Sequence, residues 1–284
     1  MKTSNGTLYI VATPIGNLSD ISYRAVETLR QVARIYAEDT RNSIKLLTHY
    51  EIRNQLSALH DHNEASKINE IALLLAEDND IALISDAGTP LISDPGYKLV
   101  RELAKQGFNI SPIPGASAMT AALSVAGLPT DKFTFEGFLP AKKSARIKAL
   151  EKNKIQSYTQ VYYESSHRII ASVATMCEVM GEEREVCLAR EITKLYEQIF
   201  RGTLQGLLAW LEEDSNHQRG EFVVVLAGHV TIVDASADRQ SAERLLTALL
   251  PDISVKKSAS IVAKLTSFSK NEAYKIALEI NGRS

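Results

Sequence analysis

The stretch Ile81–Gly96, which reads IALISDAGTPLISDPG, constrains the fold of this 284-residue chain more than any other. Its first four residues form an apolar run bounded by turn formers, a pattern typical of a strand buried on both faces of a parallel sheet. The next twelve residues hold two Asp, two Gly and two Pro, so their backbone polar groups need partners outside a helix or sheet. A ligand is one such partner, because α/β sheets bind small molecules beyond the carboxyl ends of their strands. The alternative is an ordered surface loop with two Asx turns.

Four further apolar runs predict the other strands of the same sheet. They lie at Leu8–Ala12, Ile35–Ala37, Leu56–Leu59 and Asn109–Ile113. Helical patterns separate these runs, so that strands alternate with helices five times along the first half of the chain. This alternation predicts an α/β fold with a mostly parallel sheet and right-handed crossovers.

The turn after the first predicted strand bears on the kind of ligand. The strand ends at Thr13–Leu18, and Asp20 is expected to cap the helix that follows. A Rossmann-type dinucleotide site would place the motif GxGxxG at this turn. The motif is missing, which argues against a standard NAD site.

The second half of the chain repeats the alternation and then changes character. The pattern restarts after Pro129, which predicts an N-terminal α/β domain over residues 1–128 and a second α/β domain over residues 129–232. Residues 233–284 instead read as short helices, with Ser254 and Ser269 as expected caps, and predict a module of helix-turn-helix type. The strands expected in the second domain are Phe133–Pro140, Tyr158–Tyr163, Glu185–Ala189 and Glu221–Ala227, and its helices include Lys142–Lys154 and Ser166–Met180.

Composition excludes several classes of protein. With 45% hydrophobic and 23% charged residues the chain is expected to be globular, and its net charge of -2 argues against a nonspecific nucleic-acid binder. The basic residues are concentrated near the end, since residues 238–284 hold eight Lys or Arg and five Asp or Glu. No signal peptide or membrane span is predicted, so the expected location is the cytoplasm. Cys177 and Cys187 lack CxxC spacing and read as core residues.

Four charged clusters follow predicted strands. Since the carboxyl ends of parallel strands meet at one edge of a sheet, the clusters are expected to line one cleft between the two domains. The alternative for each cluster alone is a solvated loop. The clusters are Glu38–Arg41, His60–His62, Glu164–Arg168 and Arg190–Lys194.

A further turn, Pro114–Ala118, links the strand Asn109–Ile113 to a predicted helix, Met119–Ala126. Its Gly-Ala-Ser sequence presents free backbone N–H groups at a helix N-terminus, which suits a ligand carboxylate or ribose oxygens. An ordinary strand-to-helix connection with Ser117 as the cap is an equal alternative.

These motifs together resemble a known family. In order along residues 8–228 they are ATPIGNLSDI, AEDTR, LHDHNE, SDAGTPLISDPG, PIPGASA, FEGFLPAK, YYESSHR, ARE followed by TK, and GEFV. They are similar to the ribosomal RNA branch of the tetrapyrrole methylase-like superfamily of S-adenosylmethionine-dependent methyltransferases. Tetrapyrrole enzymes of that superfamily usually carry GxGPG after the first strand. This chain has Pro14-Ile15-Gly16-Asn17 there, which favours the RNA branch.

The resemblance implies an activity and a set of partners. It implies two α/β domains with S-adenosylmethionine in the cleft between them, in a homodimer that has no membrane partner. The implied reaction is 2′-O-methylation of a cytidine in the decoding region of 16S rRNA, on the assembled small ribosomal subunit. The cofactor contacts that it implies are Pro14, Ser85, Asp86, Ala87, Gly88, Asp94, Ala116, Ser117, Phe138, Tyr163 and Glu164.

A hydroxyl acceptor is a weak nucleophile, so methyl transfer to it benefits from a positioned base as well as from alignment. The sequence leaves four candidates for this base open: Asp39, His60, His62 and Glu191. Arg41, Arg190 and Lys194 are expected to hold phosphates. The sequence His60-Asp61-His62 also raises a metal site as an alternative, but no third ligand with suitable spacing is evident. Further candidates for phosphate contacts are Lys142, Lys143, Arg146, Lys148, Lys256, Lys257, Lys264, Lys270 and Lys275.

Two other functions remain open at this point. One is a methyltransferase for a tetrapyrrole or another small molecule, which would not need the basic tail. The other is a ribosome-binding factor that uses the cleft for recognition without catalysis. Binding of S-adenosylmethionine separates this last possibility from the two methyltransferases.

Overall fold

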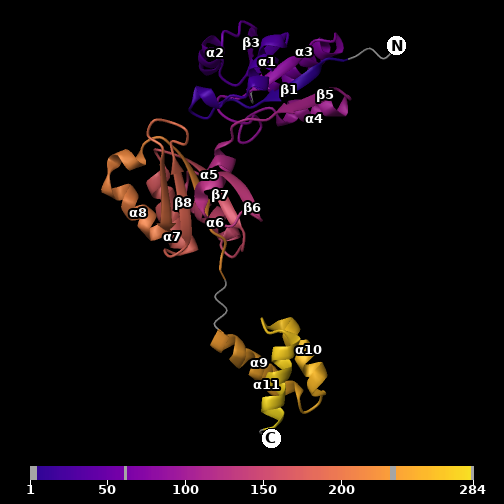
Figure 1. Ribbon diagram of the computed structural model, residues 1–284, viewed down its shortest axis with the longest axis vertical. Coiled ribbons are helices and arrows are strands. Elements are labelled where there is room, and N and C mark those ends of the chain that lie inside the picture. The colour runs from indigo at the N-terminus through magenta and orange to yellow at the C-terminus, as the bar shows by residue number, and fades with distance from the viewer. Residues whose placement is uncertain (1–4, 61–62, 231–234, 283–284) are drawn as a thin grey trace. The chain divides into compact units, whose positions relative to one another are not determined.

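The computed structural model of the chain describes residues 5–60, 63–230 and 235–282. The chain divides into two compact units, Met1–His229 and Val230–Ser284. The first unit holds two five-stranded sheets with helices, and the second is helical (Figure 1). The expected α/β fold class is confirmed: there are two sheets with helices, followed by a small helical region.

The first sheet is entirely parallel and has the order β3-β2-β4-β1-β5. The strand β4, Ile81–Ile84, is fully buried at its centre, as the apolar run predicted. Because β1 is its neighbour, the loops that follow β1 and β4 leave the sheet side by side. The remaining strands are β1 (Thr7–Val11), β2 (Arg34–Ala37), β3 (Gln55–Ala58) and β5 (Asn109–Ile113).

Apolar clusters cover both faces of this sheet, which explains why its strands are continuous apolar runs. One cluster joins Leu29 and Val32 to Ile84, and the other joins Ile71 and Leu99 to Leu83. The helices that supply these clusters are α1 (Tyr23–Gln31), α2 (Thr40–His49), α3 (Glu64–Ala76) and α4 (Tyr97–Lys105).

The cap expected for α1 was wrong. Asp20 ends a short 3-10 turn, η1 (Leu18–Asp20), and Ser22 is the N-cap of α1. The Ser22 hydroxyl accepts a hydrogen bond from the backbone N–H of Ala25 at 3.1 Å. The two residues are both good caps, and the intervening turn shifts the start of the helix.

The second sheet is mixed, with the order β6-β7-β10-β8-β9. β10 (Glu221–Leu226) runs antiparallel to both neighbours, β7 (Thr159–Ser165) and β8 (Glu185–Arg190). β7 and β8 therefore run in the same direction, and their carboxyl ends lie at one edge. β6 (Phe133–Phe138) pairs with β7 in parallel, and β9 (Gln198–Thr203) forms a hairpin with β8.

β9 has no counterpart among the predicted strands. The strand lies at the edge of the sheet, and its sequence, QIFRGT, has few apolar residues. Apolar and polar residues therefore do not alternate clearly along it, so no pattern predicts a strand.

Three helices cover one face of this sheet: α6 (Lys143–Asn153), α7 (Ile169–Met180) and α8 (Leu204–Glu213).

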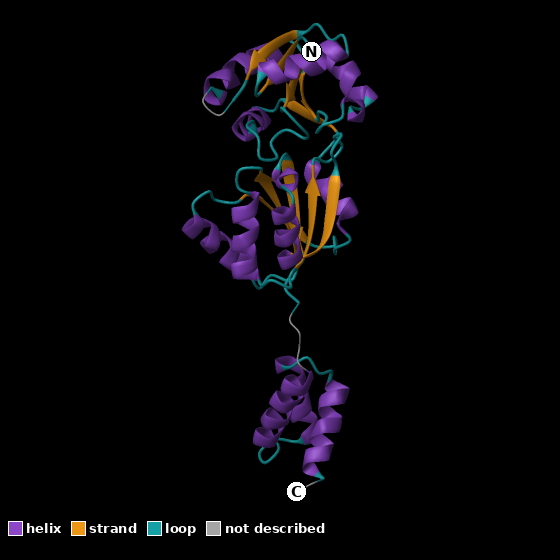
Figure 2. Ribbon diagram, turned by 90° about the vertical axis from the view of Figure 1, so that its left-hand side faces the viewer, coloured by secondary structure: helices purple, strands orange, loops and turns teal. Residues whose placement is uncertain are grey.

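The opposite face of the second sheet is covered by α5, Ala118–Ala126, which follows β5 of the first sheet. Ala122 and Leu123 of α5 pack in one cluster with Cys187 and Val225 of the second sheet. The helix that follows the last strand of the first sheet therefore packs on the second sheet. Figure 2 shows the helices and strands of this first unit by type of secondary structure.

The helical unit consists of α9 (Ala235–Leu249), α10 (Val255–Leu265) and α11 (Lys270–Asn281). Leu246, Val262 and Ala277 lie in its buried core. The predicted caps differ in quality. Ser269 forms a capping box with Glu272, whereas Ser254 stands at the N-cap of α10 without a side-chain hydrogen bond. No helix among the described residues has the length and apolar character needed to cross a membrane.

Candidate functional site

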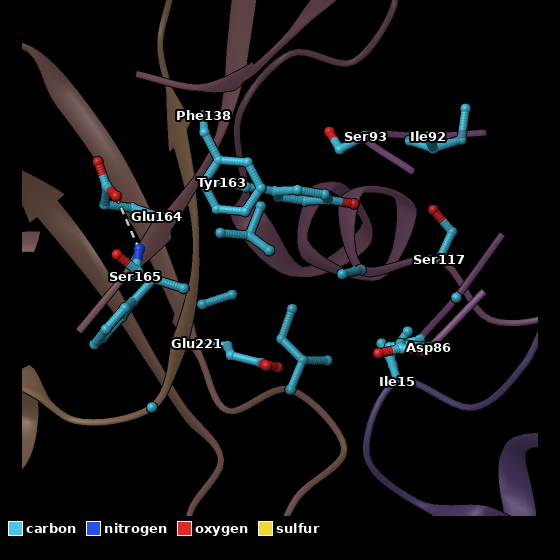
Figure 3. Close-up of a pocket in the computed structure, with 18 of the residues that line it drawn as sticks. Ile15, Asp86, Ile92, Ser93, Ser117, Phe138, Tyr163, Glu164, Ser165 and Glu221 are labelled. Atoms are coloured by element: carbon cyan, nitrogen blue, oxygen red, sulfur yellow. Dashed lines mark hydrogen bonds between the residues drawn. The ribbon is translucent and has the colours of Figure 1, made fainter. Parts of the chain in front are cut away.

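A pocket of about 420 Å³ lies among loops of both sheets in the first unit (Figure 3). This volume is within the range of small-molecule sites. The first sheet contributes residues that follow β1, β4 and β5, and the second contributes the ends of its strands and the loops that follow. The lining residues are Ile15, Asp86–Thr89, Ile92–Asp94, Ser117, Ala118, Phe138, Tyr163–Ser166, Ala189, Ile192, Lys194 and Gly220–Val223.

The loop after β4 is fixed to the loop after β1 by a backbone bridge. Thr13 N–H donates to the Gly88 carbonyl at 2.9 Å, and Gly88 N–H donates to the Thr13 carbonyl at 3.1 Å. Gly88 has a φ of 85°, and a Cβ at this position would lie 3.2 Å from Ile15 Cγ2. Glycine therefore gives this turn its left-handed conformation and leaves room for Ile15 at the pocket wall.

The second part of the β4 loop has an unusual backbone. Leu91 and Ser93 have φ values of 73° and 69°, which side-chain-bearing residues rarely adopt. Gly96 follows with a φ of 120° and directly precedes α4. Such strained positions persist only where surrounding contacts hold them, and they gather at functional sites. Here they place Ile92, Ser93 and Asp94 at the pocket.

The two aspartates of the β4 loop have different surroundings. Asp86 accepts hydrogen bonds from Asp39 N–H at 3.1 Å and from Asn42 Nδ2 at 2.9 Å. Asp94 is half-buried, and its burial raises the pKa of the carboxyl to about 6. The Ser85 hydroxyl opposes this shift of the pKa, and the like charge of Asp86 adds to it.

The cluster after β2 supports the β4 loop from outside the pocket. Asp39 caps α2, accepting from Arg41 N–H at 2.9 Å, and its carboxylate forms an ion pair with the Arg41 guanidinium at 2.6 Å. The Arg41 side chain holds the pKa of Asp39 at about 2. Neither residue lines the pocket.

Phe138 and Tyr163 form an aromatic wall on the side of the second sheet. A bulge in β6 between Phe135 and Gly137, which has a φ of 65°, precedes Phe138, a residue that is 53% exposed. The two ring centroids are 5.7 Å apart. The Tyr163 hydroxyl accepts from the N–H of Met119 at 3.2 Å, and in Figure 3 it points toward the side where Ser93 and Ser117 lie.

Glu164 is a buried carboxylate held by three donors. Arg168 forms an ion pair with it at 2.8 Å, Ser172 Oγ donates at 2.6 Å and Ser165 N–H donates at 2.8 Å. The Arg168 guanidinium lies 5.9 Å from the centroid of the Phe138 ring. Glu164 thus anchors the cation that packs against the aromatic wall.

The loop after β8 closes another side of the pocket. Lys194 Nζ lies between two carboxylates, at 2.9 Å from Glu191 Oε1 and 2.7 Å from Glu221 Oε2. Burial lowers the pKa of Lys194, but the two carboxylates outweigh this effect and raise it, so the side chain is a cation. Glu191 and Thr193 have φ values of 51° and 66°, and Thr193 Oγ1 accepts from the N–H of Asn17 at 3.2 Å.

Two arginines predicted to contact phosphates donate hydrogen bonds to acceptors within the protein. The guanidinium of Arg190 is buried. Its Nε donates to the Arg219 carbonyl, and its Nη1 donates to the Tyr196 carbonyl and to Gln198 Oε1, at 2.7 to 3.1 Å. Arg146 is also buried. Its donors are used by Thr175 Oγ1 and by carbonyls of the protein, which leaves it inside the second sheet's helical layer.

The structure brings together many of the residues selected from the sequence, but not all. Pro14, Ser85, Ala116 and the half-buried His60 are not among the lining residues. Asp39, Arg41, Arg190 and Glu191 also lie outside the lining, and His62 falls outside the described residues. Those in the lining are Asp86, Ala87, Gly88, Asp94, Ser117, Phe138, Tyr163, Glu164 and Lys194.

Sequence reasoning missed several lining residues. Ile15 and Ile192 are apolar positions in loops, and no pattern distinguishes such a residue from a core residue. Glu221 belongs to the GEFV motif, which marked its position without giving it a role. Its pairing with Lys194 depends on β10 lying between β7 and β8, which the order of strands in the sequence does not reveal.

Models of two protein families match the chain. The family described as Tetrapyrrole (Corrin/Porphyrin) Methylases matches residues 7–208. The family described as RsmI C-terminal HTH domain matches residues 235–281, which cover the three helices of the second unit.

Curated relatives match over nearly the whole chain, and each is named Ribosomal RNA small subunit methyltransferase I. The relative from Pseudomonas aeruginosa is 47% identical over 99% of this chain and 100% of its own length. The relative from Escherichia coli O157:H7 is 48% identical over 98% of this chain and 97% of its own length. One from Synechocystis is 41% identical, over 97% and 98%.

Solved structures show the same fold at low sequence identity. A diphthine synthase gives a TM-score of 0.59 at 15% identity, covering 78% of this chain and 90% of its own. A cobalt precorrin-4 methyltransferase gives 0.57 at 17% identity, covering 78% and 94%. The fold of two sheets with their helices is thus common to enzymes with different names.

Proposed function

The chain belongs to the tetrapyrrole methylase family, and we propose on that basis that it methylates the RNA of the small ribosomal subunit, with S-adenosylmethionine as the methyl donor. More finely, the proposed reaction is 2′-O-methylation of a cytidine in the decoding region of 16S rRNA, in the cytoplasm, by a homodimer. The observation that carries the proposal is the pocket lined from both sheets. Relatives named Ribosomal RNA small subunit methyltransferase I match 98% to 99% of the chain that holds this pocket.

The pocket fits the donor in size and in chemistry. Its first side offers the backbone of a glycine-containing turn, Asp86–Gly88, and the N-terminus of α5 at Ser117. Gly88 N–H already donates to the Thr13 carbonyl, but the N–H groups of Asp86, Ala87 and Ser117 suit the carboxylate and ribose oxygens of an adenosylated amino acid. Its other side offers apolar and aromatic surface from Phe138, Tyr163 and Ile192, which suits an adenine ring. Ser85 and Ala116 support this turn from behind, through hydrogen bonds to and from the loop.

S-adenosylmethionine supplies a methyl group on a sulfonium, which is transferred by in-line displacement. The protein's contribution is then to align the acceptor hydroxyl with the methyl carbon and to take up the hydroxyl proton. Among the described residues that line the pocket, Lys194 is the basic one. Two of its three N–H donors are used by Glu191 and Glu221, and we assign the third to a phosphate beside the acceptor ribose.

The helical unit supplies further cations for the RNA. Lys256 and Lys257 at the start of α10, and Lys264 near its end, are exposed, as are Lys270 and Lys275 of α11. An exposed basic surface of this kind binds phosphates with little dependence on sequence. We therefore assign this unit to the recruitment of the small subunit.

The experiment that tests the function is deletion of the gene, followed by mapping of 2′-O-methylation across 16S rRNA by mass spectrometry. We expect one cytidine mark in the decoding region to disappear, and to return when the intact chain is supplied from a plasmid. If every methyl mark survives the deletion, the proposal is wrong. Calorimetry with S-adenosylmethionine separates an enzyme from a ribosome-binding factor, because only the enzyme needs the donor.

Truncation tests the role of the helical unit. A chain that ends at His229 removes the whole second unit and leaves the pocket residues in place. We expect its affinity for small subunits to fall while its affinity for S-adenosylmethionine is kept. Unchanged modification of rRNA by the truncated chain would show that the unit is dispensable.

A further inference from the structure

A second pocket, of about 730 Å³, lies beside the first one and shares Gly220 with it. The loop after β8 lies between the two pockets, because its residues line both of them. Ile192 and Lys194 line the first pocket, whereas Leu195 and Tyr196 line the second. A ligand chain that leaves the first pocket over this loop therefore enters the second.

Lys194 stands at the boundary between the two pockets. Its Nζ lies 2.9 Å from Oε1 of Glu191, which lines the second pocket, and 2.7 Å from Oε2 of Glu221, which lines the first. The phosphate assigned to the third donor of Lys194 is therefore placed where one pocket meets the other. In a ribonucleotide the 2′-hydroxyl is adjacent to the 3′-oxygen, so the phosphate closest to the acceptor hydroxyl leads to the next nucleotide on the 3′ side. The second pocket is in position to receive that nucleotide.

Tyr196 offers the second pocket an exposed aromatic ring on a fixed backbone. The residue is 68% exposed, and its neighbour Leu195 is 88% exposed. The Tyr196 carbonyl accepts a hydrogen bond from Arg190 Nη1 at 3.1 Å. The next N–H along the chain, that of Glu197, donates to the Lys194 carbonyl at 3.2 Å. Exposed aromatic rings stack on the unpaired bases of RNA, and a ring on a fixed backbone loses little entropy when it does so.

The second pocket also has polar groups that match the edge of a base. Arg190 is only 7% exposed and uses Nε and Nη1 in hydrogen bonds within the protein. Its Nη2 has no hydrogen-bond partner among the residues that the structure describes, so it can donate to a base oxygen. His217 Nδ1 lies 2.8 Å from the Trp210 carbonyl, which only accepts, so Nε2 of the neutral ring is left as an acceptor. Nucleobase edges carry both acceptors and donors.

The charged residues of the second pocket disfavour a phosphate inside it. Carboxylates outnumber guanidinium groups by three to two among the described residues of its lining, which are Glu191, Glu197 and Asp214 with Arg190 and Arg219. A phosphate would meet a net negative charge there, whereas an uncharged base would not. This distribution of charge favours the phosphate at Lys194 and the base in the second pocket.

We propose that the second pocket binds the nucleotide on the 3′ side of the acceptor, with its base stacked on Tyr196. This role rests on the function proposed above and names a further contact of the same substrate. The stacked base holds the RNA strand in an unpaired conformation and so fixes the acceptor ribose beside the first pocket. Tyr196 binds substrate and takes no part in the transfer of the methyl group.

The test compares Tyr196→Ala with the intact chain on small subunits isolated from the deletion strain. Subunit affinity is measured by titration, methyl transfer by single-turnover reactions with radiolabelled S-adenosylmethionine, and donor affinity by calorimetry. We expect the subunit Kd to rise about 5- to 150-fold, as loss of one base–aromatic stack predicts. The maximal rate should change less than this Kd, and the donor Kd should stay the same because Tyr196 lies outside the first pocket. The ring is uncharged, so the dependence of the subunit Kd on salt should not change.

Two further variants control for other effects of the substitution. Tyr196→Phe keeps the ring and should bind subunits as the intact chain does. Tyr23→Ala removes an equally large side chain that is 94% exposed on α1 and lines neither pocket, so the subunit Kd should not change.

Subunits that carry a purine or a pyrimidine on the 3′ side of the acceptor identify the partner of the ring. The intact chain should bind the purine form more tightly, because a larger base stacks better, and Tyr196→Ala should remove most of this difference. Three outcomes would overturn the inference: an unchanged subunit Kd for Tyr196→Ala, the same loss of affinity for Tyr196→Phe, or a response to the neighbouring base that is absent or that Tyr196→Ala retains. A change in the oligomeric state of Tyr196→Ala on sedimentation would also overturn it, since the surface would then be an interface between copies of the chain. If the intact chain transfers no methyl group to the subunits, the proposed function itself fails, whereas normal transfer with an unchanged Kd for Tyr196→Ala refutes the second pocket alone.

Discussion

Gly16 packs directly against Lys194, so closely that a Cβ at position 16 would overlap Lys194 Cγ and lie 2.9 Å from Thr193 Oγ1. The first residue belongs to the turn after β1, and the second to the loop after β8. Together with the hydrogen bond from Asn17 N–H to Thr193, this contact joins the two sheets at one edge of the pocket.

Gly16→Ala should therefore impair methyl transfer by moving Lys194 away from its two carboxylates. Overpacking at such a contact costs about 1–3 kcal/mol of unfolding free energy. We expect a lower midpoint in urea unfolding and a rate of transfer reduced by more than the change in donor affinity. Gly206→Ala is the matched control, because its Cβ would meet only an ordinary contact at 3.5 Å inside α8. Equal behaviour of the two variants would show that the contact at Gly16 has no functional role.

Gly88→Val should abolish binding of S-adenosylmethionine. Its φ of 85° disfavours any side chain, by about 1–2 kcal/mol, and a branched side chain would also crowd Ile15 at the pocket wall. Calorimetry measures the binding, and circular dichroism checks that the variant is folded. Gly107→Val shares a positive φ of 82° but has open space around it, so it should lose stability and keep the donor. A folded Gly88→Val chain that binds the donor normally would contradict the assignment of the loop.

Lys194→Met should weaken binding to small subunits in a manner that depends on salt. Loss of one phosphate contact reduces the slope of log K against log salt concentration by about 0.7–0.9. Titrations of subunits between low and physiological salt measure this slope. Lys105→Met removes one charge from α4, where Lys105 is paired with Glu102 outside the pocket, and its slope should not change. The phosphate role of Lys194 is wrong if the two variants give the same slope.

Asp94→Asn should change how the stability of the chain depends on pH. The folded chain raises the pKa of this carboxyl above its value in the unfolded chain, so folding favours the protonated form. That contribution is fully present below about pH 4 and is lost as the pH rises through about 6. The variant should therefore melt at a higher temperature than the intact chain at pH 7.5, and the difference should shrink toward zero near pH 4. Thermal unfolding at a series of pH values checks this, and a constant difference would argue against the raised pKa.

Local patterns predicted most of the elements of the first unit. β4 and β5 have the predicted bounds, because an apolar run fixes each one without reference to distant residues. β9 was missed because an edge strand needs no apolar period. The cap of α1 was placed two residues early because Asp20 and Ser22 satisfy the same chemical rule.

Prediction of the site was less complete, and the reason is physical. Residue type shows that Asp39, Glu191 and Arg190 are charged, but their hydrogen-bond partners decide whether those charges are available. Arg190 donates hydrogen bonds to oxygens of residues that lie 6 to 29 positions away in the chain. Asp94 and Asp86 have the same chemistry in the sequence, and only burial and neighbouring donors make them different.

The helix α5 carries a consequence for synthesis of the chain on the ribosome. Its apolar residues Ala122 and Leu123 emerge soon after β5, but the strands that cover them, which include Cys187 and Val225, are made roughly 60 to 100 residues later. At about 5–20 residues per second the helix waits several seconds for its partners. During that interval the growing chain exposes an apolar surface that the first sheet does not cover, so the first sheet and its last helix do not mature together.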